Sequence, residues 1–135
     1  MKKIEYIIEA KKQNILLKFP EQKELTIFIF RIILEMLQED FDVITQKSKR
    51  LKKVFDYVVS ILEKAREQNV KKQYVIDLLD VFLDNDIIMY LSQKLEKNRA
   101  EYILAIKSAR SELYCSQWSD TDSNHWQRAI KCFGL

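Results

Sequence analysis

Apolar residues recur at every third or fourth position along most of this chain, which is the spacing of one face of an α-helix. This pattern predicts five helices and a short sixth, at Lys3–Lys18, Glu21–Asp40, Gln46–Arg66, Val70–Leu83, Ile87–Tyr114 and His125–Cys132. The chain has one glycine and one proline, whereas β-rich folds need turn residues about every 8 to 12 positions. We therefore expect an all-α fold, a compact bundle of five helices plus a short C-terminal helix, in a single domain over residues 1–135.

The second predicted helix is apolar on almost every side. Between Leu25 and Leu37 the polar exceptions are Thr26, Arg31 and Glu35. A helix of this kind must be covered on most of its surface, so we expect it to be central, wrapped by the other helices or by a partner subunit. The apolar run of about 13 residues is shorter than the roughly 20 that cross a bilayer, which predicts that the chain has no membrane span.

The fifth predicted helix is long for a domain of this size. At a rise of 1.5 Å per residue it spans about 42 Å. We expect it to bend or to project toward a neighbour.

Composition narrows the class of protein further. The hydrophobic fraction of 47% and the charged fraction of 32% are typical of a folded, water-soluble domain. The net charge of +3 permits contact with nucleic acid but does not require it. Cys115 and Cys132 form no CxxC pair, and the chain has a single histidine, which argues against a zinc site. We expect two reduced thiols in a cytoplasmic protein, and no cofactor motif is present.

A cluster of positive charge lies at the start of the third predicted helix, within QKSKRLKKVF. Helical spacing places some of these amines opposite the apolar stripe, and further basic residues extend the surface on the third and fifth helices. Amines on a rigid helix can contact the phosphates of nucleic acid without reading its sequence. The alternative is a solvated face, or one that pairs with acids of a partner chain. The candidate nucleic-acid contacts are Lys47, Lys49, Arg50, Lys52, Lys53, Lys64, Lys107 and Arg110.

Three aspartates, Asp77, Asp80 and Asp84, fall on one face of the fourth predicted helix. Their carboxylates could bind a divalent cation, but no glycine-containing calcium loop accompanies them. We favour the alternative, a wet face that receives a neighbouring basic helix, and predict no metal site.

The C-terminal part contains the chain's single histidine and both tryptophans. His125 lies near Asp120 and Asp122, but the sole glycine is Gly134, so the turn and oxyanion donors of a hydrolase are missing. We expect no catalytic residue and no enzyme. Trp118 and Trp126 could stack on bases or anchor a partner; we favour packing of the loop and terminal helix onto the bundle.

The chain resembles the small subunit of type I CRISPR effector complexes, in its size, its all-helical pattern and its basic helix from Lys47 to Lys53. The resemblance implies several copies stacked along a complex, contacts with other protein subunits, and a role in steadying the displaced or target DNA strand. On this basis we expect a non-catalytic, nucleic-acid-associated subunit. The alternative is a protein-only binding module, such as a small immunity or inhibitor protein that blocks a partner surface.

Overall fold

The computed structural model describes residues 3–114 and 123–134, and within these residues it is all-helical, as the sequence predicts. The α-helices are α1 (Lys3–Lys18), α2 (Lys23–Gln38), α3 (Lys47–Glu67), α4 (Lys72–Phe82), α5 (Asn85–Leu95), α6 (Arg99–Tyr114) and α7 (Ser123–Lys131). Short 3₁₀ turns lie at η1 (Pro20–Gln22), η2 (Phe41–Val43) and η3 (Glu96–Asn98).

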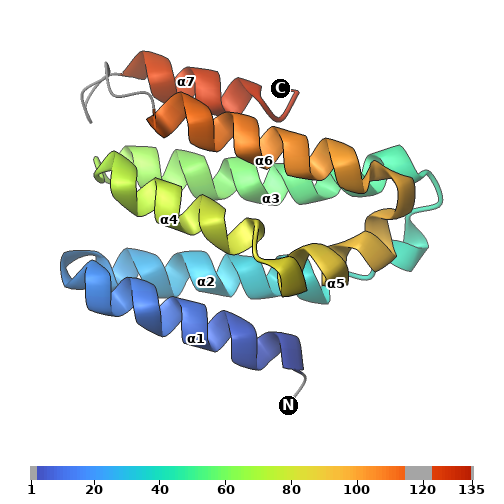
Figure 1. The fold of residues 1–135 in the computed structure, drawn as a ribbon, viewed down its shortest axis with the longest axis horizontal. Helices are drawn as coiled ribbons and strands as arrows, with labels where there is room; N and C mark the ends of the chain where they lie inside the picture. Colours follow the sequence, from blue (N-terminus) through green and yellow to red (C-terminus); the bar gives the residue numbers. More distant parts are fainter. Residues whose placement is uncertain (1–2, 115–122, 135) are drawn as a thin grey trace.

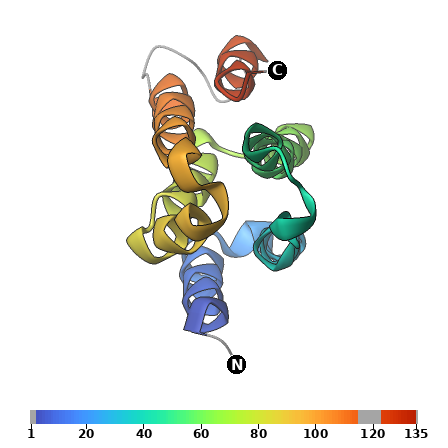
Figure 2. The ribbon, with the colours of Figure 1, turned by 90° about the vertical axis from the view of Figure 1, so that its right-hand side faces the viewer.

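The helices form two layers with one helix along each edge. Figures 1 and 2 show α2 and α3 in one layer, α4, α5 and α6 in the other, α1 along the lower edge and α7 along the upper edge. α1 packs against α2, α4 and α5, and α7 packs mainly against α6 with a second contact to α3. A single hydrophobic core runs between the layers. None of the described helices is long and apolar enough to cross a membrane.

The predicted starts and ends of the helices agree closely with the structure in the first four cases. Pro20 begins a 3₁₀ turn before α2, as its fixed φ and missing N–H favour. Asp84 accepts hydrogen bonds from the backbone N–H groups of Asp86 and Ile87 and so caps α5. At the other end of the chain, Gly134 adopts a φ of 76° just after α7, the conformation that favours glycine there.

The predicted fifth helix is two helices, α5 and α6, in agreement with the expectation that a helix of this length bends. The chain breaks at Glu96, which has φ 53° and ψ −120°, and continues as α6 in a new direction. The change of direction allows Ile87 near the start of α5 and Leu113 near the end of α6 to be buried in the same small core. A straight helix of about 42 Å would have carried one of these residues out of the core.

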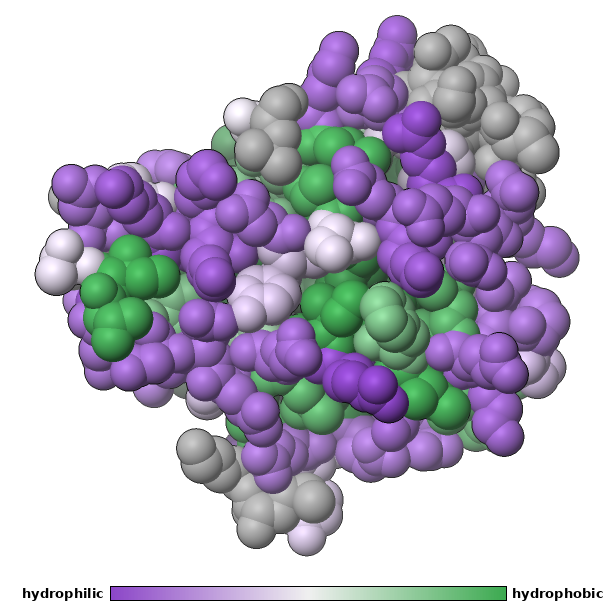
Figure 3. Space-filling model, turned by 180° about the vertical axis from the view of Figure 1, so that it is seen from behind, coloured by the Kyte–Doolittle hydropathy of each residue, from purple (hydrophilic) through white to green (hydrophobic). Residues whose placement is uncertain are grey.

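The other described helices of the chain do not wrap α2 on most sides, and its cover by a partner subunit stays a prediction. One face of α2 is buried, including Ile29 and Ile33 at 0% exposure, but Ile27 and Phe28 are 38% and 42% exposed. α4 is more enclosed than α2. Seven of the eleven residues of α4 are buried, compared with seven of the sixteen residues of α2. Figure 3 shows the face of α2 and α3, where apolar side chains reach the surface between hydrophilic ones.

Candidate functional site

The outer face of α3 carries the centre of the predicted basic surface. Leu51, Val54 and Val58 face inward and are buried, which fixes the rotation of the helix. Lys49 and Lys52 are consequently exposed on the opposite side, and Lys53 is partly exposed beside them. Lys49 lies in the first turn of α3, at the positive end of the helix dipole, and that turn contains no acidic residue. The side chain of Lys47 lies outside the described part of the structure.

Arg50 is not part of that surface, although it was predicted from the sequence to be one of the nucleic-acid contacts. Its Nε donates a hydrogen bond to the carbonyl of Ile44 at 2.8 Å, and a terminal nitrogen donates to the carbonyl of Lys94 at 3.0 Å. These bonds join the segment before α3 to the end of α5. Arg50 therefore positions the start of α3 and uses two of its five N–H donors for this.

The lysines next to Arg50 have local partners on the surface. Lys52 pairs with Asp56 at 3.2 Å, one turn along the helix. Lys53 Nζ lies 5.9 Å from the centre of the Tyr57 ring. The Lys52–Asp56 ion pair lies on exposed helix surface, where such pairs contribute about 0.3 to 0.5 kcal/mol. A cation–π contact such as that of Lys53 contributes about 0.5 to 1 kcal/mol. The two amines can exchange these partners for a ligand with only a small loss of free energy.

Acidic residues of α2 border the same face, which the sequence analysis missed. The Tyr57 hydroxyl donates a hydrogen bond to Glu39 Oε2 at 2.5 Å. This bond, partial burial and the charges of Glu39 and Glu35 raise the pKa of Tyr57 to about 12. Nothing in the spacing along either helix predicts this contact, because it depends on how α2 and α3 pack.

Lys64 extends the α3 surface toward an exposed aromatic side chain. Its Nζ lies 5.3 Å from the centre of the Phe28 ring of α2 and 3.8 Å from a carboxylate oxygen of Glu67. Phe28 belongs to the predicted central helix, so its exposure was not expected from the sequence.

Lys107 and Arg110 are not brought to the α3 surface. They lie on α6, in the other layer of the bundle (Figure 2). Lys107 is exposed, whereas Arg110 Nε binds Asp80 of α4 at 2.7 Å and its guanidinium lies 5.5 Å from the Tyr114 ring. The seven predicted contacts whose side chains are described are therefore divided among two surfaces and one structural position.

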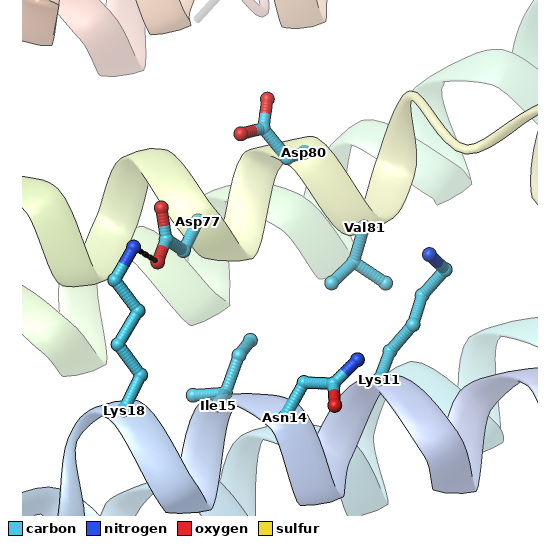
Figure 4. Close-up of a pocket in the computed structure, with 7 residues that line it drawn as sticks. All are labelled: Lys11, Asn14, Ile15, Lys18, Asp77, Asp80 and Val81. Atoms are coloured by element: carbon cyan, nitrogen blue, oxygen red, sulfur yellow. Dashed lines mark ion pairs between the residues drawn. The ribbon is translucent and has the colours of Figure 1, made fainter.

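Two of the three predicted aspartates, Asp77 and Asp80, lie on α4, whereas Asp84 lies just before α5 and caps it. All three receive basic side chains from the neighbouring helices α1 and α6, the alternative that the sequence favoured. Lys18 pairs with Asp77 at 2.8 Å, and Arg110 pairs with Asp80 from the α6 side. Lys11 pairs with Asp84 at 2.9 Å. Figure 4 shows the groove of about 190 Å³ between α1 and α4, with the Lys18–Asp77 pair at one end.

The pKa of Asp84 is lowered by its neighbours. Burial alone would raise its pKa, but the Lys11 ammonium and the backbone N–H groups of Asp86 and Ile87 hold the pKa below the usual value. In the described residues, no group of three or more histidine, cysteine or acidic side chains is close enough to hold a metal ion.

The C-terminal candidates are only partly described. Trp118, Cys115 and the side chain of His125 lie outside the described residues. Trp126 is buried on α7, which confirms the expectation that a tryptophan packs the terminal helix onto the bundle. Cys132 is half-buried, and burial together with the negative charge of Glu112 raises the pKa of its thiol.

Comparisons with known proteins found no relative: no protein-family model, no curated protein and no solved structure matches the chain at a significant level.

Proposed function

We propose that this protein is a non-catalytic subunit that contacts the phosphate backbone of nucleic acid through the start of α3. The contact surface consists of Lys49, Lys52 and Lys53, a narrower set than the sequence suggested. The observation that carries the proposal is the grouping of three amines within about one turn on the outer face of a 21-residue helix.

The surroundings of these lysines support the proposal in two ways. Arg50 holds the start of α3 against the end of α5, so the amines project from a fixed base. Lys49, in the first turn of α3, also has an unfavourable interaction of about 0.3 to 1 kcal/mol with the positive end of the helix dipole, which a bound phosphate would offset.

The resemblance to a CRISPR small subunit gives the proposal a setting. Three phosphate contacts per chain give weak, sequence-independent binding, because the energy comes largely from counterion release. Several copies side by side in a complex would strengthen the contact through effective concentration. In this setting the subunit steadies a displaced or target DNA strand.

The test is binding of labelled single-stranded and duplex DNA to the purified protein, measured by fluorescence anisotropy at two salt concentrations. Three phosphate contacts predict a log–log salt slope of about −2 to −3. The double variant Lys49→Glu, Lys53→Glu is expected to abolish most of the binding and to flatten the slope. Equal affinity and equal slope for wild type and variant would contradict the proposal.

A control variant of the same net charge separates the α3 surface from overall charge. Lys71 and Lys107 are exposed and lie on the other layer of the bundle. Lys71→Glu with Lys107→Glu is expected to leave most of the binding intact. If both double variants lose binding equally, net charge is responsible and the assigned surface is wrong.

A second candidate function, a protein-only binding module, is favoured by the exposed apolar side chains. Ile27 and Phe28 of α2, together with Leu17 of α1 at 81% exposure, are large apolar residues on the surface of the single chain. A contiguous exposed apolar patch commonly marks a contact with another protein, and Ile27 and Phe28 are adjacent on α2. Loss of partner capture by Phe28→Ser, with unchanged DNA binding, would distinguish this function from the first.

A further inference from the structure

Helix α1 carries apolar residues on both of its faces. Ile4, Ile8 and Ile15 are buried on the inner face, where α1 packs against α2, α4 and α5. On the outer face Tyr6 and Leu17 are 64% and 81% exposed, and Leu17 is the most exposed large apolar side chain among the described residues. Packing within the bundle explains the first set of residues but not the second.

Tyr6 and Leu17 are the ends of an uncharged stripe along the outer face of α1. Ala10 and Gln13 lie between them and are also exposed. The four residues of this α1 stripe follow one another in steps of four, three and four, which is the spacing of the seam by which one helix pairs with another. Four positions border the stripe, and one of them is charged: Ile7, Glu9, Asn14 and Leu16.

The single charge at the border already has partners within the chain. Glu9 accepts an ion pair from Lys12 at 2.8 Å and a hydrogen bond from Gln13 at 3.0 Å. A helix that covers the α1 stripe therefore buries no charge that lacks a partner, which would otherwise be costly. Access to the stripe is open as well. Figures 1 and 2 show α1 along the lower edge of the bundle, with its outer face turned away from the other helices.

The order of residues along the α1 stripe is complementary to itself in the antiparallel direction. Tyr6 and Leu17 lie equally far from the middle of the stripe, and so do Ala10 and Gln13. If a second copy of α1 packs antiparallel about a two-fold axis, Tyr6 faces Leu17 of the second copy and Ala10 faces Gln13. Large side chains then meet at both ends, and the small Ala10 leaves room for the longer Gln13. The two-fold axis repeats each contact.

The chemistry of the α1 stripe favours a second copy over a charged ligand. Charged residues make up 32% of the chain, yet none lies on the stripe. An uncharged face offers nothing to a phosphate backbone, whereas it can meet its own copy without repulsion between like charges. Gln13 also limits the arrangement, because a polar residue in an apolar seam specifies the register of the helix pair. A parallel pair would instead place Ala10 opposite Ala10 and leave a gap.

We propose that the α1 stripe is a docking surface for a second copy of this chain, in an antiparallel, two-fold pair of α1 helices. The inference goes beyond the proposed function, since the pairing needs no nucleic acid and uses no residue of α3. A dimer joined through α1 carries two copies of the α3 surface. It should therefore bind a long nucleic-acid strand more tightly than a single chain does, through effective concentration.

Sedimentation velocity of the full chain over a range of concentrations tests the pairing. Wild type is expected to form a dimer as concentration rises, and the dimer should persist at moderate salt because its contacts are largely apolar. Leu17→Lys should raise the dimer dissociation constant by about 100-fold or more, since two apolar side chains are lost from each dimer. Leu17 is exposed in the single chain, so the variant should fold, which circular dichroism checks.

A matched control separates the α1 stripe from exposed apolar residues in general. Leu104 of α6 is 67% exposed, so Leu104→Lys makes the same change of charge elsewhere and should leave the dimer intact. Equal loss of the dimer in both variants would overturn the proposal. So would a wild type that stays monomeric at every concentration, which would leave the stripe to a helix of another protein.

A mixture of two variants tests the antiparallel register. Ala10→Glu and Gln13→Lys should each weaken the dimer when present alone. In an antiparallel pair of the two variants, the new carboxylate of one chain faces the new ammonium of the other, so an equimolar mixture should form heterodimers. In a parallel pair these two positions do not face each other. A wild-type dimer combined with a mixture that gains no association would overturn the antiparallel arrangement.

DNA binding keeps the two proposals separate. Leu17→Lys and Leu104→Lys have the same net charge and retain the lysines of α3, so both should bind a short strand equally well if the proposed function holds. On a long strand, the Leu17 variant should bind more weakly than the Leu104 variant. A dimer that binds no DNA would leave the docking surface intact and remove the proposed function. DNA binding by a wild type that is always monomeric would do the reverse.

Discussion

The hydroxyl groups of Thr26 and Tyr74 lie 2.8 Å apart in the core and join α2 to α4. Thr26 also lies 2.7 Å from the carbonyl of Gln22, to which it donates its only hydroxyl proton. The Tyr74 hydroxyl is therefore the donor to Thr26. Both side chains are fully buried, so the Tyr74 proton depends on Thr26 for an acceptor, whereas Thr26 also has its bond to Gln22.

The direction of this hydrogen bond predicts unequal costs of removing its two ends. Tyr74→Phe leaves Thr26 bonded to Gln22 and should lower the free energy of unfolding by about 1 kcal/mol. Thr26→Val leaves the Tyr74 proton buried without an acceptor and should cost about 1 to 3 kcal/mol. Urea denaturation of the two variants measures both, and the double variant should cost less than their sum. A larger cost for Tyr74→Phe than for Thr26→Val would reverse the assigned direction.

The buried face of α2 should respond strongly to truncation, although α2 is not central. Ile29 and Ile33 are at 0% exposure. Changing either to Ala should cost roughly 2 to 4 kcal/mol, through lost burial and the cavity that remains. Ile27→Ala, on the exposed side of the same helix, is the matched control and should cost less than half as much. Similar costs at both positions would show that α2 is covered in solution.

Helix positions could be predicted from the sequence because they depend on local spacing. The apolar period, Pro20 and Asp84 mark the first four helices within a few residues. The neighbours of α2 could not be predicted from the sequence. The apolar period shows how much of a helix surface is apolar, but it does not show which part of that surface other helices cover. Ile27 and Phe28 show the difference, since they are as apolar as Ile29 yet lie on the outside.

The break between α5 and α6 had no sequence signal of its own. Neither glycine nor proline lies near Glu96, so the backbone adopts φ 53° with a side chain that disfavours it. Glu96→Gly should therefore be more stable than Glu96→Ala by about 1 kcal/mol, since both lose the same carboxylate and differ in the backbone. Thermal unfolding of the two variants tests this, and equal stability would show that the backbone there is not strained.

The candidate site could be predicted in part, because the exposure of some of its residues depends only on spacing along their own helix. Lys49, Lys52 and Lys53 could be placed outside because they oppose the stripe of Leu51 and Val54 on their own helix. The role of Arg50 depends on carbonyl groups of two other segments, and those contacts exist only after the bundle has formed. Contacts of this kind cannot be predicted from one helix alone.

The Lys11–Asp84 pair predicts a defined dependence of stability on pH. The folded-state pKa of Asp84 is lowered, so its contribution is present above about pH 4 and is lost as pH falls through the folded-state value. The difference in unfolding free energy between wild type and Asp84→Asn should therefore shrink as pH falls below about 4. Denaturation curves from pH 7 down to pH 2.5 measure this. Lys11→Met, which removes the partner but keeps the cap of α5, should show a weaker dependence; a difference that stays constant with pH would exclude the lowered pKa.

Arg50 and Lys53 lie three residues apart on α3 and should behave in opposite ways. Arg50 donates hydrogen bonds to the carbonyls of Ile44 and Lys94, so Arg50→Ala leaves two partly buried acceptors unpaired and should cost about 1 to 3 kcal/mol. Lys53→Ala removes one surface amine and should cost less than about 0.5 kcal/mol. Hydrogen exchange should show faster opening of the first turns of α3 in the Arg50 variant only. DNA binding should weaken in the Lys53 variant without any change in exchange, and equal stability of the two variants would return Arg50 to the contact surface.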